Sequence, residues 1–333
     1  MENKMENKME NKREQVLENK KERKRSIVIL YSDLCEEWIE LLKRGGYNTL
    51  GLHFITSHSR LEEYLSWLER EGRPLIERIE AEGILVEHEL HALTYLLPRE
   101  EFETHPEWYR VDRSGARTPD RNLCCASEEA LAMVEERAYR LAEALRQSGH
   151  RYYLWSDDAT DAWCHCPRCE GVPPSDQNLR ILRRILKGLR RHDPEAELCN
   201  LSYLGTLEPP TEPIPEEIFL EYAPIKRNMF KPMTDEENRP HREALERLLT
   251  VFPPERTEIL EYWLDVSLYT KWGKLPPEKV PYDEKVLRAD FSYYSSFGVC
   301  SIKTFGAFMS RDYLARFGDR EIVDYGQLLR TFG

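Results

Sequence analysis

Two adjacent aspartates are the residues of this chain most suited to proton transfer. Asp157 and Asp158 directly follow the apolar run YYLW. Two neighbouring carboxylates repel each other, and this repulsion pushes one of them towards protonation. A carboxylic acid that stays protonated near neutral pH is what a general acid requires. The aspartate pair is therefore our first candidate for catalysis.

A cluster of cysteines follows in the segment WCHCPRC. Cys164, Cys166 and Cys169 form a CxCxxC pattern, which suits one side of a tetrahedral zinc site. The segment NLCCASEE supplies a fourth ligand, for which we choose Cys124 and keep Cys125 as the alternative. Four protein ligands close the coordination sphere, so the predicted zinc is structural. It would hold the loop that carries Asp158.

The elements that position these residues are short apolar segments alternating with amphipathic helices. We expect eight strands: Ser26–Tyr31, Asn48–Phe54, Ile84–Leu90, Arg151–Asp158, Glu197–Tyr203, Ile218–Pro224, Glu258–Leu264 and Val299–Phe305. Alternation of strands with helices predicts a parallel sheet, and eight repeats predict a closed (β/α)8 barrel. The link TLEPPTEPIPEE, after the fifth strand, is too rich in proline for a regular helix. An open doubly wound sheet is the alternative, but the sequence contains no GxGxxG turn.

Polar and aromatic residues gather where these strands end, which is where such barrels build their sites. Aromatic faces with a few carboxylates suit a carbohydrate, because sugar rings have apolar C–H faces and a glycosidic bond needs acid groups. Arg117, in the long third loop, is a candidate for binding an anionic sugar such as a uronic acid. The other candidates for substrate contact are His53, His88, Glu89, His91, Trp155, Tyr203, Glu221, Tyr222, Trp263 and Lys303.

Composition limits the class of protein. The chain has 333 residues, 41% of them hydrophobic, and a net charge of −12, which argues against a nucleic-acid partner. No apolar run is long enough to cross a membrane, and the N-terminus lacks the apolar core of a secretory signal. Eight cysteines are then read as thiols or metal ligands of a cytoplasmic protein. Residues 1–25, with three MENK copies, predict a disordered or loosely helical tail before one domain over 26–333.

The segments HELHALTYLLPREEFETHPEWYRVDRSGARTPDRNLCCAS and WSDDATDAWCHCPRCEG resemble a bacterial group of glycoside-hydrolase-like barrel domains. Their motifs cover Glu87–Gly171, and the strand series extends the likeness over Ser26–Gly333. The cysteine pattern is also similar to the zinc site of family 42 β-galactosidases. In that family, an Asn-Glu pair at strand four provides the acid/base, and a Glu at strand seven is the nucleophile. Here Asp157-Asp158 replaces Asn-Glu, so the resemblance implies Asp158 as acid/base and Glu261 as nucleophile of a retaining glycosidase.

A second resemblance, to family 20 hexosaminidases, implies a different mechanism. Those enzymes carry an Asp-Glu pair at strand four and use the acetamido group of the substrate as nucleophile. Asp157 would then orient the acetamide, Asp158 would again be the acid, and Glu261 would only bind. Two further hypotheses stay open: a catalytically silent sugar-binding barrel, and a lyase or isomerase whose His-rich third strand holds a divalent metal. The sequence leaves a homo-oligomer open.

Overall fold

The computed structural model of the chain describes residues 23–56, 59–271, 275 and 278–331. Most of the predicted tail lies outside these residues. The boundary differs from the expected one, because the first strand begins at Lys24. Lys24 belongs to the barrel, since its ammonium pairs with Glu87 at 2.5 Å and Glu258 at 3.1 Å.

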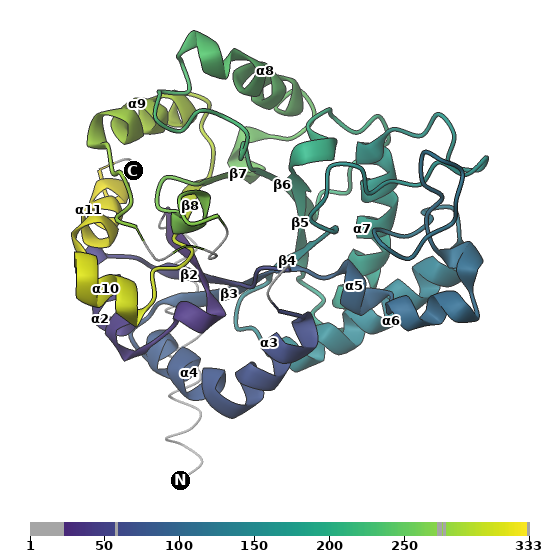
Figure 1. Ribbon diagram of the computed structural model, residues 1–333, viewed down its shortest axis with the longest axis horizontal. Coiled ribbons are helices and arrows are strands. Elements are labelled where there is room, and N and C mark those ends of the chain that lie inside the picture. The colour runs from purple at the N-terminus through teal and green to yellow at the C-terminus, as the bar shows by residue number, and fades with distance from the viewer. Residues whose placement is uncertain (1–22, 57–58, 272–274, 276–277, 332–333) are drawn as a thin grey trace.

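Eight parallel strands close into a barrel in sequence order, which confirms the expected (β/α)8 fold and excludes the open sheet (Figure 1). The barrel closes where β8 pairs with β1, with Lys303 beside Ser26. The strands are β1 (Lys24–Leu30), β2 (Thr49–His53), β3 (Leu85–His91), β4 (Arg151–Trp155), β5 (Glu197–Ser202), β6 (Ile218–Tyr222), β7 (Thr257–Glu261) and β8 (Ser301–Phe305).

Helices surround this barrel, as Figure 1 shows. A π-helical stretch, Leu68–Gly72, separates the helices Leu61–Trp67 and Arg73–Ala81. Between β5 and β6, residues 203–217 contain only a 3-10 turn, as the prolines of this link predict. The α-helices are α2 (Glu36–Gly45), α3 (Leu61–Trp67), α4 (Arg73–Ala81), α5 (Leu93–Leu96), α6 (Glu128–Leu145), α7 (Pro174–His192), α8 (Arg239–Leu248), α9 (Glu284–Ser295), α10 (Arg311–Phe317) and α11 (Arg320–Leu329). None of the described helices has the length and apolar character needed to cross a membrane.

Alternate side chains of each strand point into the barrel, so position along the strand decides which residues can reach a site there. An apolar cluster fills part of the interior: Val28, Tyr153, Trp155, Cys199, Phe219, Leu260 and Phe305. Another part of the barrel interior is filled by charged side chains that form salt bridges with one another: Lys24, Glu87, Glu89, Arg151, Glu221, Glu258 and Lys303. Gly51 makes room for this ionic group, because a Cβ at Gly51 would lie 2.6 Å from Oε1 of Glu89.

Two long loops lie next to each other on one side of the barrel mouth. One joins β3 to α6 (residues 92–127) and the other joins β4 to α7 (residues 156–173). The helices that follow them, α6 and α7, pack closely at Gly188, where a Cβ would come within 2.1 Å of the Glu135 carbonyl. The loops also contact directly, since the His165 N–H donates to the Val111 carbonyl at 2.8 Å.

Candidate active site

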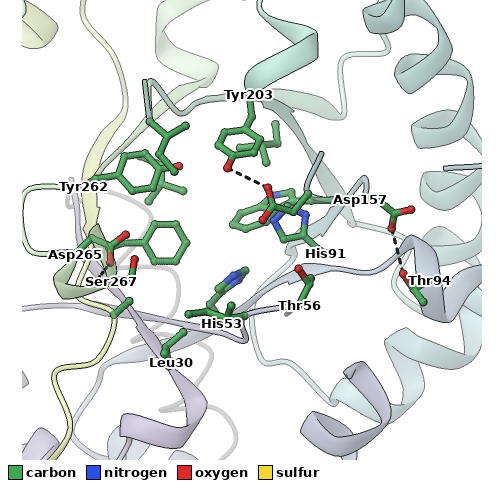
Figure 2. A pocket seen from close by; sticks show the side chains of 18 of the residues that line it. Leu30, His53, Thr56, His91, Thr94, Asp157, Tyr203, Tyr262, Asp265 and Ser267 are labelled. Atoms are coloured by element: carbon green, nitrogen blue, oxygen red, sulfur yellow. Dashed lines mark hydrogen bonds between the residues drawn. The ribbon is translucent and has the colours of Figure 1, made fainter. Parts of the chain in front are cut away.

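A cavity of about 700 Å³ opens at the C-terminal ends of the strands (Figure 2). This is the end at which (β/α)8 barrels carry their sites. Its lining includes the acids Asp120, Asp157, Asp158 and Asp265, the imidazoles His53 and His91, and the aromatic side chains Trp155, Tyr203, Tyr262 and Phe305. Of the sequence-predicted residues, the structure brings Asp157, Asp158, His53, His91, Trp155 and Tyr203 to this cavity.

Asp158 is the exposed acid that follows β4. The Tyr203 hydroxyl donates a hydrogen bond to Oδ1 of Asp158 at 3.1 Å. Burial raises the pKa of Tyr203, and the charges of Asp158 and Asp265 raise it further. The phenol therefore stays protonated at neutral pH and orients the carboxyl group of Asp158 from β5.

Asp157 has a different environment from its neighbour. Its carboxylate pairs with Arg99 and accepts a hydrogen bond from the Thr94 hydroxyl at 3.2 Å. Figure 2 shows this side chain directed towards Thr94. The Asp157 N–H donates to Oδ1 of Asn122 at 2.9 Å. Asp157 is thus tied to the β3–α6 loop by both its backbone and its side chain.

Two histidines from neighbouring strands, His53 and His91, form another part of the lining. Nδ1 of His53 lies 2.5 Å from the Glu89 carbonyl, and Nδ1 of His91 lies 2.5 Å from the Ser156 carbonyl. A carbonyl only accepts, so each ring carries a proton on Nδ1. Burial and the charge of His91 together lower the pKa of His53 to about 3, so His53 is neutral at physiological pH and keeps a lone pair on Nε2.

Tyr262 and Asp265, which follow β7, line the cavity although neither was among our chosen site residues. The Tyr262 ring stacks on Phe305 with centroids 5.5 Å apart, and both side chains offer apolar faces. The Asp265 carboxylate is 3% exposed and accepts from the Ser267 N–H at 2.9 Å. The sequence does contain a signal for this acid, because Asp265 caps the short turn Val266–Leu268, a place where aspartate is favoured.

Glu261, the expected nucleophile, does not line this cavity, which is a correction to the sequence analysis. Its side chain points out of the barrel and is completely buried against α9. The carboxylate accepts from Arg227 at 2.9 Å and from the Tyr294 hydroxyl, and Arg227 also pairs with Asp290 at 2.6 Å. The neighbouring Leu260 faces inward, so Glu261 is on the opposite face of β7.

The same alternation removes three further residues from the predicted site. The His88 ring contacts the Tyr64 hydroxyl, the Tyr222 hydroxyl donates to the His241 carbonyl at 2.7 Å, and Nε1 of Trp263 donates to Asp290 at 3.2 Å. These side chains lie between the barrel and the helices. His88 and Glu89 face opposite sides of β3, so the structure does not support a divalent-metal site built from the third strand.

Glu89, Glu221 and Lys303 face inward but are completely buried and do not line the cavity. Nζ of Lys303 lies 2.7 Å from Glu89 and 2.5 Å from Glu221, and Glu258 lies 3.4 Å away. Burial lowers the pKa of a lysine, but here these carboxylates together raise the pKa of Lys303. The three residues form an internal salt bridge instead of binding substrate directly.

Arg117 is also placed away from the cavity. Its guanidinium donates to the carbonyls of Glu107 at 3.1 Å and Tyr109 at 2.6 Å, and thereby braces the β3–α6 loop. Arg121 lines the cavity in its place. The sequence alone could not show which of these two arginines, both in the β3–α6 loop, reaches the cavity.

The cysteines come together as predicted. Sγ atoms of Cys124, Cys164, Cys166 and Cys169 all lie within 4.8 Å of one another and are buried, so this group could hold a metal ion. Cys124 is 3.6 Å from Cys166 and 3.8 Å from Cys169. A tetrahedral site with Zn–S bonds of ~2.3 Å has sulfur–sulfur edges of roughly 3.8 Å, so the spacing fits zinc. The Val111 N–H donates to Sγ of Cys164 at 3.3 Å, as expected for a thiolate.

Asp33 is a buried acid that follows β1, and the charge of the cavity acid Asp265 acts on it. The pKa of Asp33 is raised to about 7, mainly by burial; the N–H groups of Phe308 and Met309 oppose this rise, and the charge of Asp265 adds to it. An unfolded aspartate has a pKa of about 3.9. The folded protein therefore holds a proton that the unfolded chain releases. The stability that this proton contributes is fully present below about pH 4 and is lost as the pH rises through about 7.

We expect Asp33→Asn, which cannot ionise, to remove this loss. The free energy of unfolding of the variant relative to wild type should rise by up to about 4 kcal/mol between pH 4 and pH 8. Urea denaturation of both proteins at pH 4, 6 and 8 measures the difference, and the other carboxylates cancel because both proteins share them. A difference that does not change with pH would contradict this account.

Taken together, the fold and the cavity define a (β/α)8 barrel with an acidic, aromatic-lined cavity at its C-terminal face and a group of four cysteines beside it. Residues 57–299 match a family described as "Domain of unknown function (DUF4838)". The match covers most of the chain, so the chain belongs to this family. No curated protein matches its sequence.

Several solved structures share the fold. A β-N-acetylhexosaminidase from Bacteroides fragilis NCTC 9343 matches with a TM-score of 0.57 at 13% identity, over 91% of this chain and 66% of that one. A catalytic mutant of the GH42 β-galactosidase Gan42B from G. stearothermophilus matches with 0.57 at 15% identity, over 92% and 56%. A β-galactosidase from Rahnella sp. R3 matches with 0.54 at 13% identity, over 88% and 53%. This chain thus spans between about half and two thirds of their lengths, and the likeness establishes the barrel fold.

Proposed function

We propose that this barrel hydrolyses glycosidic bonds of a carbohydrate, with Asp158 as the general acid. The observation that carries the proposal is the exposed Asp158 carboxyl group, oriented by the Tyr203 hydroxyl at 3.1 Å within a cavity lined by aromatic faces. Three solved barrels of the same fold are named as glycosidases, which supports this choice of reaction.

Asp157 is proposed to position Asp158 instead of touching the substrate. Arg99 neutralises its carboxylate, and Thr94 and Asn122 bind its side chain and its N–H. The substrate-assisted alternative needs this carboxylate to orient an acetamido group. The ion pair with Arg99 occupies it, so the geometry favours a mechanism with two separate acids.

Cys124, Cys164, Cys166 and Cys169 are proposed to hold a structural zinc ion. When bound, the metal would crosslink the β3–α6 and β4–α7 loops, which carry Arg121 and Asp158. Four protein ligands leave no open position for substrate. The role of this chain's cysteines is therefore to fix the two loops that form one wall of the cavity.

A panel of aryl glycosides tests the function: galactosides, N-acetylhexosaminides and uronides in both anomeric forms, assayed with wild type and with Asp158→Asn. We expect wild type to hydrolyse at least one member and the variant to lose about 10²–10⁴-fold in kcat/KM. The loss should be larger for phenyl than for 2,4-dinitrophenyl glycosides, because the better leaving group needs less protonation.

Asp161→Asn is the matched control. Asp161 is on the same loop, pairs with Arg113 at 3.1 Å and does not line the cavity, so this variant should keep wild-type turnover. No hydrolysis of any glycoside by wild type would contradict the proposal. Sugar binding in that case, unchanged by Asp158→Asn, would identify a silent binding barrel.

A further inference from the structure

Asp158 alone does not make a complete catalytic site, because a glycosidase of this type pairs its proton donor with a second carboxylate that acts at the anomeric carbon. Glu261 cannot take that part, since it faces the helices. The acids that line the cavity besides Asp158 are Asp120, Asp157 and Asp265. If the proposed function holds, one of these three acids must be the second carboxylate.

Two of these acids are neutralised by arginines. Asp120 accepts two hydrogen bonds of 2.9 Å from the buried guanidinium of Arg110. Asp157 is paired with Arg99. A carboxylate held by a guanidinium is a weaker nucleophile and is not free to approach a substrate.

Asp265 is the acid whose charge is not compensated. Among the described residues it forms no salt bridge, and it accepts a hydrogen bond from the Ser267 N–H at 2.9 Å. The side chain is almost completely buried and still lines the cavity. Burial raises the pKa of Asp265 to about 6, so the group is anionic at neutral pH, as a nucleophile must be.

The position of Asp265 relative to Asp158 also suits two carboxyl groups that act on the same glycosidic bond. Both charges raise the pKa of Tyr203 and of Tyr262, so the two acids lie around the same two phenols. The Asp158 carboxyl group lies 3.1 Å from the Tyr203 hydroxyl, and in Figure 2 Tyr203 and Asp265 lie on different parts of the cavity wall. A sugar ring in this cavity would therefore meet Asp158 and Asp265 from different parts of the wall.

We propose that Asp265 is the nucleophile of this site. A carboxylate oxygen of Asp265 forms a bond to the anomeric carbon while the bond from that carbon to the leaving oxygen breaks, and Asp158 gives its proton to the leaving oxygen. The Asp158 carboxylate then takes a proton from water, whose oxygen bonds to the anomeric carbon. The ester bond to Asp265 breaks, which restores both carboxyl groups and releases the sugar with its original configuration.

Azide rescue tests the assignment. Asp265→Ala should lower kcat/KM on the best aryl glycoside of the panel by about 10³-fold or more. Sodium azide should then restore release of the aryl group and give a glycosyl azide of opposite anomeric configuration to the substrate. Azide added to Asp158→Ala should give a glycosyl azide of the same configuration as the substrate, because the nucleophile is still present. The configuration of each product is read by NMR.

Two controls separate chemistry from folding. Asp265→Asn keeps a capping side chain for the turn at Val266–Leu268, so it should unfold at nearly the wild-type temperature while remaining inactive. Glu261→Gln should lower the unfolding temperature, because it weakens the buried pair with Arg227, while kcat of the folded protein stays close to wild type.

The outcomes distinguish this inference from the function on which it rests. If Asp158→Asn loses activity but Asp265→Ala stays within about tenfold of wild type, Asp265 is not the nucleophile and the proposed function stands. The same conclusion follows if azide restores the activity of Asp265→Ala but the glycosyl azide has the same anomeric configuration as the substrate. If wild type hydrolyses no glycoside, the proposed function and the assignment of Asp265 both fail.

Discussion

Replacing Lys303 with methionine is expected to destabilise the protein by about 3–5 kcal/mol, because it leaves buried carboxylates without their counter-ion. Nζ of Lys303 lies within 2.7 Å of both Glu89 and Glu221 in the completely buried interior of the barrel. Burial raises the pKa of Glu89 and of Glu221, and Lys303 opposes that effect. Without the lysine, both acids should take up protons, and the barrel should unfold at lower urea concentration.

The control for Lys303→Met is a triple variant that adds Glu89→Gln and Glu221→Gln. It removes the two anions together with the cation, so it should recover much of the lost stability, because an uncompensated charge costs more than a neutral polar group. Urea denaturation at pH 7 compares the three proteins. A single variant within about 1 kcal/mol of wild type would show that the cation is not required, since an unpaired buried charge costs more than that.

Removal of the proposed zinc ion is expected to have the second large effect. Protein purified without chelator should contain about one zinc per chain, and Cys166→Ser should contain much less. Structural zinc contributes free energy of folding, so the variant should unfold at a lower temperature and its two loops should become sensitive to protease. Activity should fall as well, because one of these loops carries Asp158.

Cys125→Ser is the matched control for the metal site. Cys125 is buried and its Sγ lies 3.7 Å from that of Cys169, yet it is outside the group of four. The variant should therefore keep its zinc. Metal analysis by mass spectrometry measures both variants. Zinc lost from Cys125→Ser and retained by Cys124→Ser would reverse the choice between the two neighbouring cysteines, and no zinc in wild type would contradict the site.

The sequence predicted the barrel and the cysteine group because both depend on local patterns. Eight apolar segments, most of them followed by a helix, restrict the topology strongly, and CxCxxC restricts the positions of three sulfurs. The position of Asp158 at the cavity was predicted for a similar reason, since it follows a strand whose end is easy to locate. These features can be predicted without knowing which side chains of a strand point into the barrel.

Glu261, at the end of β7, and Trp263, just after it, were assigned to the wrong face for a physical reason. In a barrel, both faces of a strand are buried, one in the interior and one against helices, so the strand EILEYWL lacks the alternation that reveals its orientation. Glu261 and Trp263 lie on the helix side, and Leu260 and Tyr262 on the cavity side. Arg227, which pairs with Glu261, comes from the loop after β6. Its contact with Glu261 could not be predicted from the spacing of the two residues in the sequence.

The fixed proton of His53 limits how a ligand can bind beside it. With Nδ1 of this ring donating to the Glu89 carbonyl, Nε2 can only accept, and His53 keeps this state at any pH well above 3. A hydroxyl group that donates its hydrogen satisfies such a nitrogen, whereas a ligand carbonyl would place two lone pairs against each other. This part of the lining therefore distinguishes an alcohol from its ketone at the same ring carbon, and it does so without using a charge.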